Sequence, residues 1–303
     1  MSIVSKTCMN IMNLVGNIAI FSKERNPEEE LAKAKEYRTK HPFRMPTDKR
    51  AFYTRKDIAG YPCLIIRQTE KAKRKVILYL HGGLQNIWKS EISIARDYGK
   101  RTEMDVWYPI YPSIMEAPLR NIIDVIYEMY HEMVVLYGAE NCAVVGGSMG
   151  GFFALQLINM LNEKTEKAFM PKLLIALSPG GVPDDEAGWA AMERYSQKDP
   201  VLKVFDVRMK EKIIHLLDPE CPKRYYTPSA ADFSDAPTTF IFYAEETCAG
   251  NAEGYRKAYE KAHAGEKLHM HIEPDLMHCY AIMPIFKESR RDYYKQIRLL
   301  KKL

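Results

Sequence analysis

Short runs of apolar and β-branched residues alternate with longer helix-period segments from about residue 60 onward. Strands that alternate with helices are typical of a parallel sheet whose crossover connections are helical. The pattern therefore predicts an α/β fold with a large, mostly parallel sheet flanked by helices. The expected strands are Cys63–Arg67, Val76–Leu80, Val106–Ile110, Cys142–Gly146, Leu173–Leu177, Thr239–Tyr243 and Leu268–Glu273.

The clearest helical pattern lies in Ala117–Tyr137. Apolar residues there recur three and four positions apart, for example at Ile122, Val125, Ile126 and Met129. This is the spacing of a helix that buries one face. Further helices are expected over Gly150–Leu161, Asn251–Ala264 and Met283–Leu300.

Two segments break the alternation of strands and helices. Residues 1–50 are helical in pattern and then punctuated by proline, and residues 183–217 have a helical pattern without a strand. Each segment is too short to build a hydrophobic core of its own. We therefore expect a single domain over residues 1–303, with a small helical cap formed by about residues 1–50 and 183–217.

Composition and charge narrow the class of protein. The chain has 303 residues, of which 47% are hydrophobic and 27% charged, which is typical of a folded globular protein and excludes a disordered one. The net charge is only +5, and both signs are dispersed along the chain. Such a weak excess predicts neither a nucleic-acid partner nor an acidic membrane surface. The sequence leaves homodimerisation open.

The sequence predicts neither export nor membrane insertion. The opening Met1–Phe21 is fairly apolar, but Asn10, Asn13 and Asn17 interrupt it and no small-residue cleavage site follows. No run approaches the roughly 18 apolar residues of a spanning helix. The six cysteines form no CxxC pair, so we expect free thiols and a cytoplasmic location.

The most informative motif is Gly146-Gly147-Ser148-Met149-Gly150, which follows an apolar strand and begins a helix. This is the GxSxG pattern of a nucleophilic serine, in the strand-turn-helix context that the chemistry needs. The sharp turn forces strained backbone geometry on the serine and leaves no room for Cβ atoms beside it. The motif predicts that Ser148 stands at the carboxyl edge of the sheet, where open α/β folds bind ligands.

A second motif, His81-Gly82-Gly83, ends an earlier strand. Two glycines in succession let the backbone approach a ligand closely. Their N–H groups, with that of Met149, are candidates for an oxyanion hole, which binds the negative oxygen of a tetrahedral intermediate. The alternative is a Gly-Gly loop that only makes a tight turn. We expect the His81 ring to organise the loop through hydrogen bonds.

His278 is the candidate general base. It follows the last predicted strand by a short loop, which places it at the carboxyl edge of the sheet. An acid must orient its ring, and Glu246, just after the strand Thr239–Tyr243, is the favoured candidate. Glu245 is the neighbouring alternative. Asp184 and Asp185 are alternative candidates for the acid, although acids at the first turn of a helix are common without any catalytic role.

These motifs resemble the hormone-sensitive-lipase-like esterases of the α/β-hydrolase superfamily. The resemblance spans about Pro62 to Pro284, and the chain order of Ser148, an acid and His278 also matches that superfamily. It implies an α/β-hydrolase fold, a cap from the amino-terminal helices and an insertion, and hydrolysis of short or medium acyl esters without a metal or cofactor.

The chain departs from the family pattern at three positions. The usual third glycine of the oxyanion loop is Leu84, and the usual aspartate before the nucleophile is Gly147. The usual acidic position falls on Glu246 or Thr247, depending on register. A glutamate can serve there if the loop adjusts, whereas a threonine would orient His278 less well.

Together these residues predict a serine hydrolase that cleaves small carboxylic esters through an acyl-enzyme intermediate. Ser148 is expected to attack, His278 to transfer the proton, Glu246 to orient His278, and Gly82, Gly83 and Met149 to bind the oxyanion. The alternatives are an amidase, arylformamidase or peptidase with the same triad, and a binding protein on a hydrolase scaffold. The residues expected to line the substrate pocket, unless they are ordinary core, are Leu84, Trp88, Trp189 and Tyr280.

Overall fold

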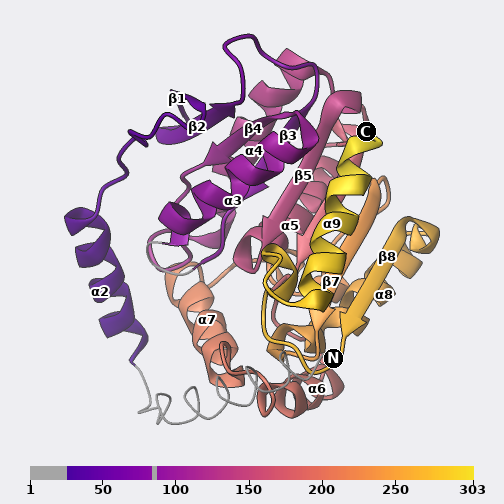
Figure 1. The fold of residues 1–303 in the computed structure, drawn as a ribbon. Coiled ribbons are helices and arrows are strands. Elements are labelled where there is room, and N and C mark those ends of the chain that lie inside the picture. Colours follow the sequence, from indigo (N-terminus) through magenta and orange to yellow (C-terminus); the bar gives the residue numbers. More distant parts are fainter. Residues whose placement is uncertain (1–25, 84–86) are drawn as a thin grey trace.

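The computed structural model describes residues 26–83 and 87–303, with the backbone alone at residues 87–90. In this part of the chain eight strands form one sheet in the order β1-β2-β4-β3-β5-β6-β7-β8 (Figure 1). The strands are β1 (Phe52–Ile58), β2 (Tyr61–Arg67), β3 (Val76–Leu80), β4 (Asp105–Pro109), β5 (Cys142–Gly147), β6 (Leu173–Leu177), β7 (Thr238–Ala244) and β8 (Leu268–Glu273).

The pairing directions define one functional edge of the sheet. Strands β1 and β2 pair antiparallel, as do β2 and β4, and every pairing from β4 through β3 to β8 is parallel. The carboxyl ends of β3, β5, β6, β7 and β8 therefore meet at a common edge. This confirms the predicted mostly parallel sheet, and all seven predicted strands are present.

Strand β1 is the strand that the sequence pattern does not reveal. It lies at the edge of the sheet and is paired only with β2, and Ile58 is its one buried residue. Its polar positions include Lys56, whose ammonium pairs with Glu132 of a neighbouring helix. A strand exposed along most of its length has no apolar face for a hydrophobic pattern to detect.

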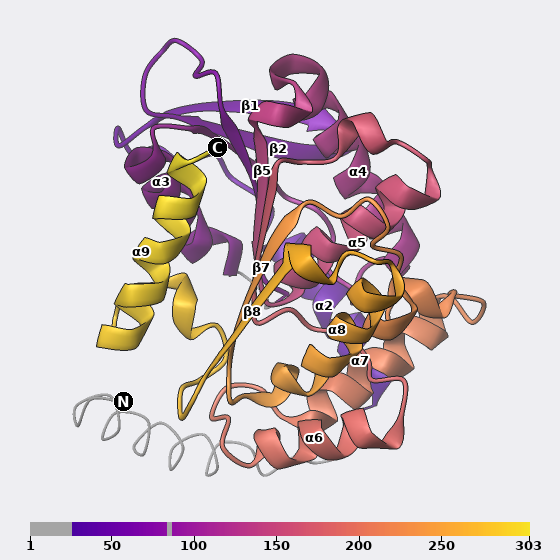
Figure 2. The same ribbon diagram turned by 90° about the vertical axis from the view of Figure 1, so that its right-hand side faces the viewer.

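Helices cover both faces of the sheet (Figure 2). Helices α3 and α9 pack on one face, where the rings of Tyr98 and Tyr293 lie 5.3 Å apart. Helices α4, α5 and α8 pack on the other face. The predicted helices are confirmed, and α3 is an addition to them. The bounds are α3 (Ile87–Thr102), α4 (Leu119–Tyr137), α5 (Met149–Glu163), α8 (Ala252–Lys261) and α9 (Lys287–Lys301).

The segments expected to form a cap contain helices in their described part, although residues 41–50 and 197–203 are not helical. They contain α2 (Pro27–Lys40), α6 (Glu186–Ser196) and α7 (Val204–Leu217), and α7 contacts α2. Helix α6 contacts the short 3-10 helix Thr247–Asn251 that follows β7. These helices therefore reach the carboxyl edge of the sheet, while residues 1–25 of the expected cap lie outside the described residues.

Two further expectations concern the thiols and the membrane. The cysteines of the described residues are free thiols, as predicted. Among the helices that the structure describes, none combines the length and the apolar character needed to cross a membrane.

Two glycines allow β5 to run directly into α5. A Cβ atom on Gly146 would lie 2.2 Å from the carbonyl oxygen of Gly150, and one on Gly150 would lie 2.0 Å from the carbonyl oxygen of Leu80. Backbone atoms cannot yield as a flexible side chain can. The close contact of α5 with β5 and β3 therefore requires glycine at both positions.

We predict that Gly150→Ala destabilises the protein by about 3 kcal/mol or more, because the new methyl group would force α5 away from β3. The matched control is Gly265→Ala, where the nearest atom to a new Cβ is Glu260 Cγ at 3.7 Å. That variant should change the free energy of unfolding by less than about 1 kcal/mol. Urea denaturation of both variants checks this, and equal stabilities would contradict the steric argument.

Candidate functional site

Ser148 stands in a strained turn between β5 and α5. Its backbone has φ 55° and ψ −121°, a region that costs a residue with a side chain about 1–3 kcal/mol. The turn is held because the Ser148 N–H donates to the carbonyl of Leu177 at 2.8 Å, and the Ser148 carbonyl accepts from Phe152 at 3.0 Å. The hydroxyl is therefore presented at the carboxyl edge of the sheet.

His278 reaches this hydroxyl from the loop after β8. Its Nε2 lies 2.9 Å from Ser148 Oγ, although the two residues are 130 positions apart. The loop is anchored beside it, because the N–H of Cys279 donates to the hydroxyl of Ser178 at 2.9 Å. Ser178 follows β6, so the residue that anchors the His278 loop also lies at the carboxyl edge of the sheet.

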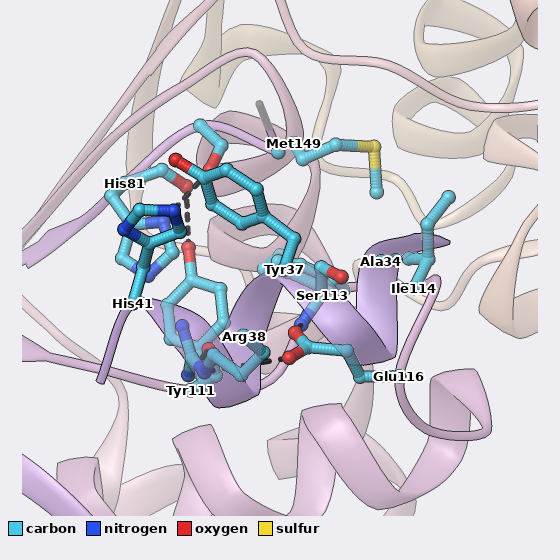
Figure 3. A pocket seen from close by; sticks show the side chains of 13 residues that line it. Ala34, Tyr37, Arg38, His41, His81, Tyr111, Ser113, Ile114, Glu116 and Met149 are labelled. Atoms are coloured by element: carbon cyan, nitrogen blue, oxygen red, sulfur yellow. Dashed lines mark hydrogen bonds and ion pairs between the residues drawn. The ribbon is translucent and has the colours of Figure 1, made fainter. Parts of the chain in front are cut away.

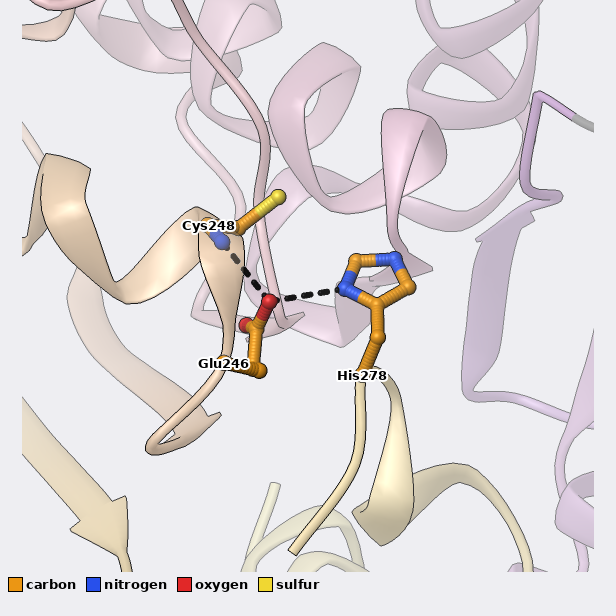
Figure 4. Close-up of side chains that lie close together, drawn as sticks. All are labelled: Glu246, Cys248 and His278. Carbon is orange, nitrogen blue, oxygen red and sulfur yellow. Dashed lines mark hydrogen bonds and ion pairs between the residues drawn. The ribbon is translucent and has the colours of Figure 1, made fainter. Parts of the chain in front are cut away.

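Glu246 lies on the other side of the imidazole ring (Figure 4). Its Oε2 is 3.0 Å from His278 Nδ1 and accepts from the N–H of Cys248 at 2.7 Å. With the ring proton on Nδ1, His278 donates to Glu246 and accepts at Nε2 from the Ser148 hydroxyl. The carboxyl group is completely buried, so water does not compete for this contact.

The electrostatics of the pair follow from burial and proximity. Burial raises the pKa of Glu246, the positive form of His278 opposes this effect, and the carboxylate of Asp199 adds to it. Burial lowers the pKa of His278, but interaction with nearby acidic groups, Cys279 first and Glu246 next, raises it above its ordinary value. A carboxylate in direct contact stabilises the imidazolium, which is the form that results when the ring takes a proton.

The other candidate carboxylates have different partners. Glu245 pairs with Lys198 at 2.9 Å. Asp184 pairs with Lys223 at 3.1 Å, and Asp185 caps α6 by accepting from the N–H of Gly188 at 2.8 Å. Of the four acids considered from the sequence, Glu246 is the one that contacts His278.

The Gly82–Gly83 loop packs against the serine turn. Cβ atoms built on the two glycines would lie 3.7 Å from Ser148 Cβ and 2.7 Å from Met149 Cγ, respectively. His81 organises the loop as expected. Its Nδ1 lies 2.7 Å from the carbonyl of Gly82, and its ring stacks on Tyr111 with the centroids 4.2 Å apart.

The N–H of Gly82 already has a partner. It donates to Oε1 of Glu91 on α3 at 3.0 Å. Glu91 is 2% exposed, and burial raises its pKa to about 8. Glu91 could not be predicted from the sequence, because a single glutamate within a helical stretch gives no sign of the loop that it contacts.

A cavity of about 330 Å³ opens beside Ser148 and His278. Its walls are mainly apolar, and Glu91 and Ser93 are polar residues within them. The apolar side chains that line it are Ile94, Val201, Met277, Tyr280, Ile282, Met283, Ile285 and Phe286.

A smaller cavity of about 50 Å³ lies on the side of the loop that faces α2 (Figure 3). It is bordered by Tyr37 and His41 of α2 and by Met149. Arg38 of the same helix pairs with Glu116 at 3.4 Å, which ties α2 to the segment before α4. Gly82 and Gly83 line both cavities, so the glycine loop separates them.

The residues expected to bind substrate have different positions. Tyr280 lines the larger cavity, and its hydroxyl donates to Asp292 at 2.8 Å. Trp189 lies on α6 under the guanidinium of Arg208, 4.3 Å from the ring centroid, and is not part of this lining. Leu84 and the side chain of Trp88 lie outside the described residues.

Two groups of side chains in the described part of the chain bring three metal-ligand atoms together. The first combines Glu246, Cys248 and His278 (Figure 4), where hydrogen bonds already connect the carboxylate and the imidazole. The second combines His271, Glu273 and Asp292, and the guanidinium of Arg291 pairs with both of its carboxylates. The guanidinium of Arg291 therefore occupies the place beside these carboxylates that a metal ion would take.

Asp199 is another residue that the sequence did not single out. It is fully buried in the segment between α6 and α7, and its Oδ2 accepts from the N–H of Thr247 at 3.0 Å. Thr247 is the residue after Glu246, so Asp199 connects the expected cap segment to the loop that holds the acid. An aspartate in the link between two helices gives no sequence signal for such a contact.

Comparison with known proteins gives matches at the level of the family and of the fold. The sequence profile of the alpha/beta hydrolase fold family matches residues 77–282. An esterase of Acinetobacter venetianus is 28% identical over 115 residues, which is 37% of each chain. That alignment therefore covers well under half of the relative's length.

Solved structures share the whole fold at low sequence identity. An esterase from the bacterial hormone-sensitive lipase family superposes with a TM-score of 0.76 and 18% identity, over 100% of this chain and 99% of that one. A putative esterase from Staphylococcus aureus gives 0.74 and 20%, over 93% of each chain. The esterase EstE5, soaked with p-nitrophenyl butyrate, gives 0.76 and 16%, over 100% and 99%. These findings confirm the predicted resemblance and fold class.

The contact between Glu246 and His278 predicts how the ring titrates. We expect the pKa of His278 to lie above its ordinary value in the wild type and to fall in Glu246→Gln, because a neutral amide stabilises the imidazolium less than a carboxylate does. Glu245→Gln is the matched control and should leave the titration unchanged. NMR titration of the histidine ring signals checks this, and identical curves for Glu246→Gln and the wild type would contradict it.

Proposed function

Because the chain belongs to the α/β hydrolase fold family, we propose that it is a serine hydrolase that cleaves carboxylic esters through an acyl-enzyme intermediate. The observation that carries the proposal is the chain of contacts from Ser148 Oγ to His278 Nε2 at 2.9 Å and from His278 Nδ1 to Glu246 Oε2 at 3.0 Å. A nucleophile, a base and an orienting acid in this sequence activate a hydroxyl group at neutral pH.

In the proposed reaction, Ser148 Oγ attacks the acyl carbon while its proton passes to His278 Nε2. The imidazolium then gives this proton to the alcohol oxygen as the carbon–oxygen bond breaks, which leaves an acyl group on Ser148. Water attacks this ester with His278 again acting as the base. Glu246 keeps the ring in the tautomer that accepts from Ser148 and stabilises the positive charge that the ring acquires.

We assign the oxyanion hole to the N–H groups of Gly83 and Met149. Met149 is the first residue of α5, and the first N–H groups of a helix have no partner within the helix. The N–H of Gly82, which the sequence also suggests as a donor, is bound to Glu91 at 3.0 Å. Each well-placed donor contributes ~10²- to 10³-fold to turnover.

We propose that the substrates are esters of short or medium acyl chains. The cavity beside Ser148 has a volume of about 330 Å³ and mainly apolar walls, near the lower end of the roughly 300–1,000 Å³ found for small-molecule sites. We propose that the smaller cavity beyond the glycine loop binds the alcohol part of the ester. We further propose that α2, α6 and α7 act as a cap over this site.

We expect Ser148→Ala to lower kcat for p-nitrophenyl esters by ~10⁶-fold, because the hydroxyl, the base and the acid act as a unit. Ser229→Ala is the control, since this serine interacts with Asp184 outside the site and should keep full activity. The assay is initial-rate hydrolysis over an acetyl to octanoyl series, and comparison with matching anilides separates esterase from amidase activity. Equal rates for Ser148→Ala and the wild type would refute the proposal.

A further inference from the structure

Glu91 is a buried carboxyl group in the wall of the cavity that contains Ser148 and His278. It is 2% exposed, and its Oε1 accepts from the N–H of Gly82 at 3.0 Å. Among the described residues its Oε2 has no hydrogen-bond partner, although the nearby phenol of Tyr79 lowers the pKa of Glu91. Glu91 takes no part in the hydrogen bonds that join Ser148, His278 and Glu246. Its position beside them therefore needs a separate explanation.

The carboxyl group lies close to the reacting centre. A single Cβ atom placed on Gly82 would lie 3.0 Å from Oε1 of Glu91 and 3.7 Å from Cβ of Ser148. Glu91 and Ser148 therefore flank the same glycine of the loop. A negative charge on Glu91 would stand a few ångströms from the oxygen that becomes negative in the proposed tetrahedral intermediate.

The surroundings of Glu91 disfavour a charge. The titratable groups that face it are the phenols of Tyr79 on β3, Tyr98 on α3, Tyr108 on β4 and Tyr111 after β4, and each of them is buried. His278 and Cys279 line the same cavity from the loop after β8.

Among the described residues, no lysine or arginine contributes to the pKa of Glu91. Burial without a cation raises this pKa to about 8, because an isolated charge is costly in an apolar environment. At neutral pH the group is mainly a carboxylic acid, which can still accept from Gly82 through its carbonyl oxygen.

We propose that Glu91 is a positioning residue of this site: its uncharged carboxyl group holds the Gly82–Gly83 loop against Ser148, and its ionisation opposes the oxyanion and stops turnover. This inference rests on the proposed function. The hydrogen bond from the N–H of Gly82 to Glu91 anchors the loop to α3. The loop is thereby held so that the N–H of Gly83 can face the oxyanion.

The pH dependence of kcat/KM for an uncharged ester tests the proposal. The active form has a neutral Glu91, so wild-type kcat/KM should fall as pH rises through a value near 8 and approach a tenfold loss per pH unit above it. Glu91→Gln keeps an oxygen acceptor for Gly82 and cannot ionise. This variant should keep the rise that reflects His278 and lose the fall at alkaline pH.

Two further variants separate positioning from simple structural support. Glu91→Leu removes the acceptor and should lower kcat by about 10- to 100-fold at every pH, with KM changed less than twofold and the circular dichroism spectrum retained. Tyr79→Phe should keep the fall of kcat/KM at alkaline pH. That result would show that ionisation of the neighbouring phenol does not cause the fall. An alkaline fall that persists in Glu91→Gln, or a Glu91→Leu variant with wild-type kcat, would overturn the proposal.

An infrared measurement tests the ionisation of Glu91 without relying on turnover. Difference spectra of the Ser148→Ala protein between pH 7 and pH 9.5 should lose a carboxylic-acid C=O band, and Ser148→Ala with Glu91→Gln should lack that change. Failure of the proposed function would appear as undiminished hydrolysis in Ser148→Ala, whereas failure of this inference would appear as identical infrared changes in the two proteins.

Discussion

The site depends on the backbone turn at Ser148, which has a positive φ of 55°. This conformation persists only because the packing of the surrounding backbone fixes it. Gly146 and Gly150 let α5 fold back onto β5 and β3 at distances that a Cβ atom would forbid. The strain is of order 1–3 kcal/mol, and buried packing of α5 on the sheet offsets it. The result is that the hydroxyl of Ser148 is held in place at the carboxyl edge of the sheet.

Parallel strands bring the remaining groups to that edge. The loops after β3, β7 and β8 supply the glycine loop, Glu246 and His278, so residues distant in sequence meet at one edge of the sheet. Burial then gives each contact its strength, since Glu246 is shielded from water and its interaction with the imidazole is not screened. Burial has a different effect on Glu91: no cation in the described part of the chain contacts that carboxyl group, so burial raises its pKa.

Much of this arrangement could be predicted from sequence because it is local or periodic. Buried strands, the turn at Ser148 and the position of His278 after the last strand each give a pattern within a few residues. The exposed strand β1 gives none, because its side chains face water. The sequence favours Glu246 and leaves Glu245 as an alternative, and the contact with His278 that separates them joins distant segments. The contacts of Glu91 and Asp199 also join distant segments, which no pattern within one segment encodes.

The central claim is that the hydroxyl of Ser148 is the nucleophile that the surrounding structure activates. Its most direct test is covalent labelling with a fluorophosphonate, followed by peptide mass spectrometry of the wild type and of His278→Ala. The account predicts one phosphonyl group on the peptide that contains Ser148, formed at least a thousandfold more slowly in His278→Ala. A label on another residue, or equal labelling rates in the two proteins, would contradict it.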